Sequence, residues 1–543
     1  MVVARSPTII INESTIKGLF EQVDNEQVAS FRGIKYGTSE RWTKPIMSPP
    51  SSADIDATEF GAICWQIFGD VKGSGGTQSE DCLNLDIYVP AWTTASSSKL
   101  PVVIWLYGGS LIAGSTQSYT HLSSLATRMN VVLVAPNYRL AAFGWLALPE
   151  ISSSSNTNSS GNYGLMDQQL ALSWVQQYIE FFNGDKNKVT LLGQSSGGTS
   201  IFGHLSSEKS KNLFHAAISL SGSPNITVSL EDAEIRFESA LRTTTNCYNI
   251  SKSNSKSESV MDCLNKLTPS QIANVLPEEF DVSPLLPSDV NGANYPGLII
   301  VDGNIITQDL KSALALPVMD VPLVFQTMEA EMDTYFGNDT IYNMTTSEFG
   351  EFLREEFSAG NWENPNMAAE TVLSLYQDEL LVSTELGYQV FLADYSLFCG
   401  NREILLQASS SFTSPVYLVV GTQSPASPFP TIPNKPPCRY PGHNWDYVTA
   451  TSAFDMFEVR YGADAYIPGD VDFAFGEVMI SKWSAVAHMD LELLDMQRLE
   501  AGWNFVNLLD HNTSTALSQG FKARCEMLKE GGLGLDQRFW LTN

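Results

Sequence analysis

The sequence predicts a large globular α/β protein whose mostly parallel central sheet carries helices on both faces. Hydrophobic residues make up 43% of the 543 residues and aromatic residues 10%, which is ample for an extensive core. Several runs are continuously apolar, as in strands that are buried on both faces. Segments with helical spacing, such as Gln169–Phe182, alternate with these runs and indicate a parallel sheet. The predicted buried strands are Pro101–Leu106, Val131–Arg139, Phe214–Ser223, Val321–Phe325 and Pro415–Val420.

The remaining segments complete this architecture. Asn12–Trp42 alternates short apolar and polar groups, which predicts an N-terminal antiparallel meander. The polar tract Ser152–Ser160 has low complexity and predicts a solvated loop. Leu230–Met319 is mainly helical in pattern and predicts a helical insertion. Since the chain shows no internal repeat and no long linker, we expect residues 1–543 to form a single domain.

Charge and composition exclude several classes of function. The formal net charge of −29 would repel phosphate backbones and anionic membrane surfaces, so we expect no nucleic acid partner. No apolar run is as long as a membrane span, which argues against stable membrane insertion. The run Thr8–Asn12 is too short for the core of a signal peptide, so either a signal has been removed or the protein is cytosolic.

Two features favour a secreted protein whose signal peptide is absent from the given chain. There are seven cysteines, as in proteins that form disulfides in an oxidising compartment. There are also several glycosylation sequons of the form Asn-x-Ser/Thr. They begin at Asn12, Asn158, Asn225, Asn249, Asn338, Asn343 and Asn512.

The segment Lys188–Ser200 carries the most informative motif. An apolar, β-branched run leads into Gly-x-Ser-x-Gly at Gly193–Gly197, and a helical pattern follows. Such a motif is common by chance, but between a strand and a helix it is the nucleophile elbow of an α/β-hydrolase fold. The two glycines leave room for the sharp turn that lifts Ser195 out of the sheet. Ser195 is therefore the predicted nucleophile.

A serine nucleophile needs a base, an acid that orients the base, and donors for the oxyanion. In this fold the acid and then the histidine follow the serine in chain order, each on a loop after a later strand. Among the six histidines only His443 lies in a loop of turn residues after a late strand, so we predict that it is the base. The acid should follow the strand that ends at Phe325. Three carboxylates qualify there, and sequence physics leaves the choice open: Glu329, Glu331 and Asp333.

The predicted oxyanion hole is made of backbone N–H groups. Ser196, directly after the nucleophile, supplies one of them. The others should come from the loop Gly108–Ser110, which directly follows a buried strand. A Gly-Gly pair is more often only a turn, but this position favours the functional interpretation.

Several separated stretches of the sequence resemble motifs of the type-B carboxylesterases, the family that includes cholinesterases and the large fungal lipases. The resemblance is continuous from about Phe31 to Pro224 and patchy afterwards. The matching stretches are Glu80–Leu83, Asn137–Arg139, Ala142–Gly144, Gly161–Leu165 with Asp167 and Gln168, the elbow, and Ser221–Pro224. The resemblance implies an α/β-hydrolase fold and a serine carboxylesterase that needs no metal or cofactor.

Carried over by position, the resemblance implies a triad of Ser195, Glu331 and His443. It also implies an oxyanion hole made by the N–H groups of Gly109, Ser110 and Ser196.

The chain departs from the family pattern near these residues. Ser110 stands where the family has a third glycine, and Leu111 stands where it has an aromatic residue. Gln326 replaces the glycine five residues before the acid. Asn444 follows His443 where the family has glycine, and Asp446 holds the acidic position.

The cysteines can be paired in part. Cys64 and Cys82 enclose 17 residues that would form a surface loop closed by a disulfide, and Cys247 lies close enough to Cys263 to tie one local excursion. The resemblance implies the same two pairs. It further implies that Cys399 pairs with Cys525 and leaves Cys438 unpaired, although a pair of Cys399 with Cys438 stays open.

The same comparison narrows the substrate. The family's choline-site tryptophan has no counterpart among Lys72–Asp81, which disfavours a cholinesterase. The loop between Cys64 and Cys82 carries few large apolar groups, whereas the lipases of the family have a long amphipathic lid there. We therefore expect a small-molecule ester substrate, short to medium or soluble, and the sequence leaves the oligomeric state unknown. The alternatives are a triacylglycerol lipase or sterol esterase, amide or thioester cleavage, and a non-catalytic binding protein of the same fold.

Overall fold

A computed structural model describes most of the chain. The described residues are 6–23, 26–50, 53–66, 76–90, 98–119, 121–223, 227–248, 259–276, 299–316, 318–331, 339–359, 362–428, 437–442, 466–500, 506–512, 516–517, 520–528 and 530. Within these residues no helix is both long and apolar enough to cross a membrane.

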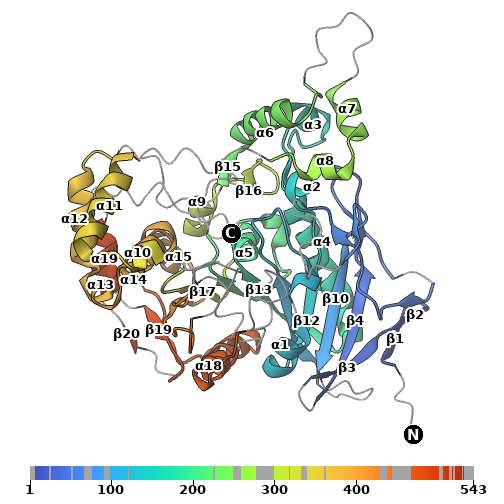
Figure 1. Cartoon of the computed structure of the whole chain (residues 1–543). Coiled ribbons are helices and arrows are strands. Elements are labelled where there is room, and N and C mark those ends of the chain that lie inside the picture. The colour runs from blue at the N-terminus through green and yellow to red at the C-terminus, as the bar shows by residue number, and fades with distance from the viewer. Residues whose placement is uncertain are drawn as a thin grey trace, which may run out of the picture.

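An 11-stranded sheet forms the centre of the molecule (Figure 1). Its middle strands are buried along nearly their whole length, as their continuous apolar sequences predict. The strands from β12 through β11 to β19 are parallel, and antiparallel strands lie at both ends. In spatial order they are β20 (Ala516–Leu517), β19 (Asn507–Leu509), β18 (Val416–Gly421), β17 (Leu323–Met328), β14 (Ala216–Leu220), β13 (Gly184–Gln194), β11 (Leu100–Leu106), β12 (Val132–Pro136), β10 (Asn84–Pro90), β4 (Glu26–Lys35) and β3 (Leu19–Val23).

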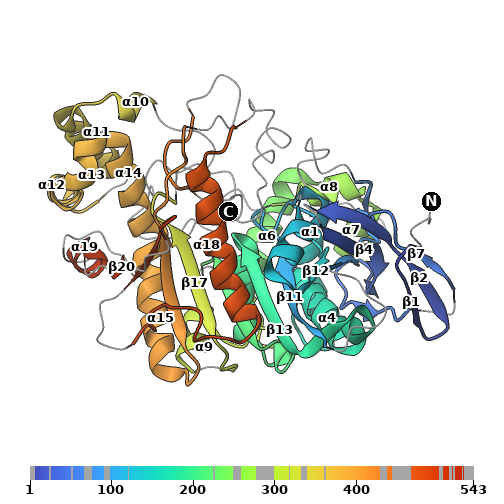
Figure 2. The ribbon, with the colours of Figure 1, turned by 90° about the horizontal axis from the view of Figure 1, so that it is seen from below.

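Helices cover both faces of this sheet (Figure 2). One face carries α1 (Leu122–Met129) and α18 (Asp470–Ala487), which are joined where Ser484 Oγ donates to the Met129 carbonyl at 3.1 Å. The other face carries the helices α4 (Tyr163–Tyr178), α5 (Ser196–Leu205), α9 (Leu310–Ala315) and α15 (Cys399–Ser411). The predicted α/β class with helices on both faces is confirmed.

Two further groups of helices flank the sheet (Figure 1). The first lies in the predicted helical insertion, in which β16 (Ile299–Val301) pairs in parallel with β15 (Thr227–Ser229), the strand directly before the insertion. Its helices are α6 (Leu230–Thr244), α7 (Val260–Lys266) and α8 (Pro269–Ala273). The second group consists of α10 (Asp339–Tyr342), α11 (Thr346–Ala359), α12 (Pro365–Leu375), α13 (Gln377–Val382), α14 (Thr384–Ala393) and α19 (Gly520–Leu528).

The N-terminal strands form two antiparallel hairpins that belong to different sheets. The hairpin of β3 and β4 extends the central sheet. The hairpin of β1 (Thr8–Ile11) and β2 (Ser14–Lys17) forms a small sheet with β7 (Ile55–Asp56). The predicted meander is therefore antiparallel, but it is divided among three sheets, since β5 (Gly37–Thr38) pairs with β6 (Ile46–Met47) in a separate antiparallel pair.

The prediction of a solvated loop over Ser152–Ser160 is wrong in two respects. The tract begins inside α3 (Pro149–Ser154), and both Ser152 and Ser160 are buried. Their hydroxyls lie 2.8 Å apart, and Ser160 Oγ also accepts the Leu148 N–H at 3.0 Å. Low-complexity composition cannot reveal such contacts, because they depend on how the tract folds back on itself.

Candidate functional site

Ser195 occupies a sharp bend between the end of β13 and the start of α5. Its backbone lies at φ 62° and ψ −129°, a left-handed φ that is costly for a residue with a side chain. Two hydrogen bonds hold this conformation: the Ser195 N–H donates to the Leu220 carbonyl at 2.8 Å, and the Ser195 carbonyl accepts the Thr199 N–H at 3.0 Å. The bend thus joins two neighbouring parallel strands at their carboxyl ends.

The two glycines of the motif are needed because the backbone passes very close on both sides. A Cβ at Gly193 would lie 2.5 Å from the Gly197 carbonyl oxygen. A Cβ at Gly197 would lie 2.1 Å from the carbonyl oxygen of Leu106, the last residue of β11. Neither position can hold a larger residue without moving backbone atoms, so the sequence interpretation of both glycines agrees with the geometry.

The loop after β11 lies against the nucleophile. A Cβ at Gly108 would lie only 2.7 Å from Ser195 Cβ, so this glycine allows the loop to reach the bend. The next residues all have left-handed backbone, with φ 121° at Gly109, 58° at Ser110 and 62° at Leu111. Within the described part of the chain, the N–H groups of Gly109 and Ser110 donate to no protein acceptor. They are therefore available as donors to an oxyanion.

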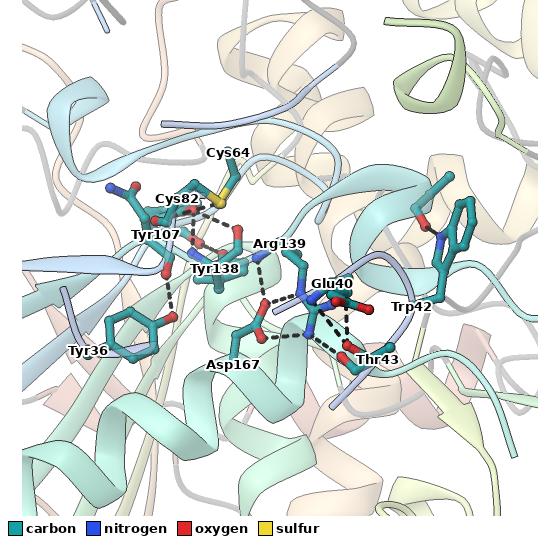
Figure 3. Close-up of polar contacts among 12 residues, drawn as sticks. Tyr36, Glu40, Trp42, Thr43, Cys64, Cys82, Tyr107, Tyr138, Arg139 and Asp167 are labelled. Atoms are coloured by element: carbon teal, nitrogen blue, oxygen red, sulfur yellow. Dashed lines mark hydrogen bonds and ion pairs between the residues drawn. A yellow bond between two sulfur atoms is a disulfide. The ribbon is translucent and has the colours of Figure 1, made fainter. Parts of the chain in front are cut away.

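Tyrosine side chains hold the start of this loop, and Figure 3 shows two of them, Tyr107 and Tyr138. Tyr107, which precedes Gly108, stacks on Tyr138 with ring centroids 4.3 Å apart. The Tyr138 hydroxyl donates to the Tyr107 carbonyl at 2.5 Å, and the Tyr107 hydroxyl accepts the Tyr138 N–H at 3.2 Å. Tyr119 adds a third contact, because its hydroxyl accepts the Gly108 N–H at 3.1 Å.

A buried ion pair anchors the chain just after Tyr138 (Figure 3). The Arg139 guanidinium makes two hydrogen bonds of 2.8 Å to the two oxygens of Asp167, and both side chains are at most 5% exposed. Arg139 also donates to the carbonyls of Thr43 and Glu40, at 2.9 and 3.3 Å. The pair therefore ties α4 to the loop after β12 and to the N-terminal segment.

Glu331 follows β17 at the same edge of the sheet as Ser195. It is completely buried, and its Oε2 accepts hydrogen bonds from the Thr327 hydroxyl and the Met328 N–H, both at 2.7 Å. A buried carboxylate with two donors on one oxygen is well oriented to accept a hydrogen bond from a histidine. Of the other two predicted acids, Asp333 lies outside the described residues.

Glu329 belongs to a different environment. The positive charge of Arg524 acts on it, and the Arg524 guanidinium binds Asp394 at 2.9 Å and Glu379 at 2.6 Å. Burial raises the pKa of Glu329 to about 7, and the positive charge of Arg524 opposes this rise. This carboxylate therefore interacts with the charged cluster around Arg524, which lies on α19.

The predicted base His443 lies outside the described residues. The chain just before it is described, and the Pro441 carbonyl accepts the Ala330 N–H at 3.2 Å. Ala330 is the neighbour of Glu331, so the segment leading to His443 runs beside the predicted acid. The structure thus places Ser195, the loop Gly108–Ser110 and Glu331 along one edge of the sheet, where the predicted nucleophile, oxyanion donors and acid are expected to lie.

Sequence reasoning missed two hydroxyls at this edge. The Ser196 side chain accepts the Leu111 N–H at 3.1 Å, and the Thr327 side chain holds Glu331. Both bonds join segments far apart in the chain or across a turn, so a single sequence offers no signal for them.

The disulfides settle the predicted cysteine pairing. Cys64 pairs with Cys82, and Cys247 pairs with Cys263, as predicted. Cys399 pairs with Cys525, which decides between the two open alternatives. Cys438 is buried and takes part in none of these three disulfides. In the described ranges, no three His, Cys, Asp or Glu side chains are grouped so as to hold a metal ion.

The amino-acid sequence is similar to those of several known hydrolases. An acetylcholinesterase from Bungarus fasciatus is 32% identical over 306 residues, which cover 53% of this chain and 47% of that protein. The pyrethroid hydrolase Ces2a of Mus musculus is 36% identical over 232 residues, 40% of each chain. The bile salt-activated lipase of Bos taurus is 37% identical over 205 residues, 36% of this chain and 33% of that protein. The chain thus spans between a third and half of the length of these relatives.

The family model named "Carboxylesterase family" matches residues 5–496, which is most of the chain. This match covers the elbow, the oxyanion loop, Glu331 and the segment around His443. The α/β-hydrolase fold described above is the fold of that family. By its sequence and its architecture, the chain belongs to the carboxylesterase family.

Proposed function

We propose that the protein is a serine carboxylesterase that cleaves carboxylic esters through an acyl-enzyme, with Ser195 as nucleophile, His443 as base and Glu331 as acid. The observation that carries the proposal is the strained bend at Ser195 with the N–H donors of Gly109 and Ser110 on the loop packed against it. The family match and the esterases and lipase among the relatives support the same activity.

In the first half of the reaction, Ser195 Oγ attacks the ester carbonyl carbon while His443 takes the hydroxyl proton. The carbonyl oxygen becomes an oxyanion that accepts hydrogen bonds from the N–H groups of Gly109, Ser110 and Ser196. His443 then gives its proton to the leaving alcohol. Glu331, held by Thr327 and Met328, stabilises the imidazolium throughout.

In the second half, water attacks the acyl-enzyme with His443 again as base. The acid is released and Ser195 regains its proton. Every proton in this cycle moves between the substrate, water, Ser195 and His443, so the proposed chemistry uses side chains and backbone donors of the protein alone.

We propose esters of short to medium acyl chains as substrates, because the loop closed by Cys64 and Cys82 carries few large apolar residues. The bile salt-activated lipase among the relatives makes long-chain esters the second candidate. Because acetylcholinesterases are among the relatives, the test also includes a choline ester.

We also propose that the protein is a secreted glycoprotein with a single domain. Three disulfides suit an oxidising compartment. The sequon asparagines that lie in described residues are all exposed: Asn12, Asn158, Asn343 and Asn512.

The test is hydrolysis of p-nitrophenyl esters from acetate to palmitate, with and without emulsion, together with acetylthiocholine. Purified protein is compared with Ser195→Ala. Serine-dependent turnover that is highest on short chains would support the proposal. Activity confined to long chains at an interface would support a lipase, and efficient turnover of acetylthiocholine would support a cholinesterase. No serine-dependent turnover on any ester would overturn the proposal.

A further inference from the structure

The side chain of Ser196 makes a contact that the proposed chemistry does not use. Its Oγ accepts the backbone N–H of Leu111 at 3.1 Å, and both residues are buried. Leu111 lies directly after Ser110, so this hydrogen bond joins the residue after the nucleophile to the loop that carries two of the proposed oxyanion donors. The bond spans 85 positions in the sequence.

The loop needs such an anchor because its backbone is strained. Ser110 and Leu111 are consecutive residues with side chains, and both have left-handed φ, at 58° and 62°. Each such residue is disfavoured relative to an extended or right-handed helical backbone, and it persists only where surrounding contacts hold it. Without support, rotation of this backbone would turn the Ser110 N–H away from the ester carbonyl oxygen that becomes the oxyanion.

The other hydrogen bonds of this segment are made by the Gly108 N–H and by the carbonyls of Gly109 and Leu111. The Gly108 N–H is held by Tyr119, and the N–H groups of Ile112 and Ala113 both donate to the Gly109 carbonyl at 3.0 Å. The Leu111 carbonyl accepts the Ala141 N–H at 2.9 Å. Among the described residues, the hydrogen bond to Ser196 Oγ is the one that ties the strained pair, Ser110 and Leu111, to the turn that carries Ser195.

We propose that the Ser196 hydroxyl is a positioning group for the oxyanion hole: it fixes the Leu111 N–H, and through it the Ser110 N–H, relative to Ser195. Ser196 would then serve twice, with its N–H as an oxyanion donor and its side chain as the anchor of the opposite donors. The role rests on the proposed function, since it concerns the same oxyanion.

The separate effects of a substitution on kcat and on KM distinguish transition-state stabilisation from substrate binding. A misplaced donor weakens the oxyanion more than the neutral ground-state ester, so kcat should fall while KM stays nearly constant. Removing a whole oxyanion donor costs about 10²–10³ in kcat, and loosening one costs less. We therefore expect Ser196→Ala to lower kcat about 5- to 50-fold with KM within about twofold of the parent.

The matched control is Ser206→Ala, at the C-terminal end of the same helix. Ser206 is also buried, and its Oγ donates to the Phe202 carbonyl at 2.8 Å, far along the helix from the oxyanion loop. This variant should keep the parent kcat and KM. Melting curves of both variants check that any loss in Ser196→Ala does not come from unfolding.

Two readouts test the anchor itself. Hydrogen–deuterium exchange should be at least about tenfold faster at the Leu111 amide in Ser196→Ala, because the acceptor of this N–H is gone. An alkyl trifluoromethyl ketone is the second probe. Ser195 Oγ bonds to its carbonyl carbon, the proton goes to His443, and the carbonyl electron pair becomes an oxyanion. Its inhibition constant should rise by the same factor by which kcat/KM falls.

The outcomes separate the two proposals. Unchanged exchange at Leu111, or parent-like kcat and ketone affinity in an active protein, would overturn the positioning role and leave the esterase proposal intact. A rise in KM at constant kcat would also overturn it, since that pattern belongs to substrate binding. A parent protein without serine-dependent turnover would overturn the proposed function, and the positioning role with it.

Discussion

The Thr327 hydroxyl donates to Glu331 Oε2 at 2.7 Å, and the Met328 N–H donates to the same oxygen at the same distance. Thr327 lies near the carboxyl end of β17, in register with Val420 of β18. A strand in the middle of the sheet thus orients the buried carboxylate. The two bonds favour the ionised form of Glu331, which is the form that a histidine needs as a partner.

Thr327→Val should lower kcat/KM about 3- to 30-fold, because it removes a hydrogen bond to a charged group with almost no change of shape. The loss should be greatest on the plateau of the pH–rate profile, where the histidine is neutral in the free enzyme. The acid limb should move to lower pH in the variant, since a carboxylate that gives less support to the imidazolium lets the histidine lose its proton at lower pH. Steady-state kinetics between pH 5 and 9 measure both effects. Thr190→Val is the control, since Thr190 is buried in β13 and its hydroxyl has no polar partner among the described residues.

Glu331→Gln should lower kcat about 10²- to 10⁴-fold, because an amide cannot stabilise the imidazolium. Glu329→Gln, two residues earlier, should keep kcat within a few-fold of the parent, since that carboxylate faces the Arg524 cluster. The pair of variants tests the choice of acid with the same substitution on the same loop. A larger loss for Glu329→Gln than for Glu331→Gln would contradict the assignment.

Asp167→Asn should destabilise the protein by about 3–5 kcal/mol, because it leaves the buried Arg139 guanidinium without its counter-ion. Urea unfolding followed by tryptophan fluorescence measures the change. The comparison variant is Asp81→Asn, which breaks an ion pair of 2.7 Å with Lys35 whose side chains are 62% and 45% exposed. That change should cost less than about 1 kcal/mol. Equal costs for the two variants would contradict the burial argument.

The native protein should show no reactive thiol towards Ellman's reagent and one thiol per chain after denaturation without reductant. The reason is that six of the seven cysteines form disulfides, and the seventh, Cys438, is buried. Alkylation in denaturant followed by peptide mapping should label Cys438 alone. Label on Cys525 would instead indicate a disulfide between Cys399 and Cys438.

Asp86→Asn tests a buried carboxyl. Burial raises the pKa of Asp86 from 3.8 to about 6, against hydrogen bonds from Thr116 and Gly33 that lower it. Between about pH 4 and 6 the folded protein therefore holds a proton that the unfolded chain has released. The contribution of this group to stability is full below about pH 4 and is lost as the pH rises through 6.

The variant keeps an acceptor for the Gly33 N–H but carries no charge, so it lacks this loss. From pH 4 to 7.5 its stability should rise relative to the parent by on the order of 1–3 kcal/mol, or roughly 1–3 °C in Tm for a chain of this size. Melting curves at both pH values give the comparison. A constant difference in Tm would contradict the raised pKa.

The sequence predicts those parts of the fold whose causes are local. Continuous apolar runs such as Pro101–Leu106 can only be buried strands, and the glycines around Ser195 reveal the bend because no larger residue fits there. The serines of α3 show the limit. Nothing in a run of serines reveals that Ser152 and Ser160 bond to each other in the interior. The hydroxyls of Ser196 and Thr327 were missed for a similar reason, because their roles depend on contacts that only the folded chain creates.

The order of the strands has a consequence for how the protein is made. From β13 through β14, β17 and β18 to β19, each strand pairs with the one before it in the sheet. A chain emerging from the ribosome can therefore extend one growing edge, and each new strand finds its neighbour already in place. The bond between Cys399 and Cys525 spans 126 residues, and Cys525 lies beyond β19 in the chain. This disulfide can therefore form only after every parallel strand of the sheet has been synthesised.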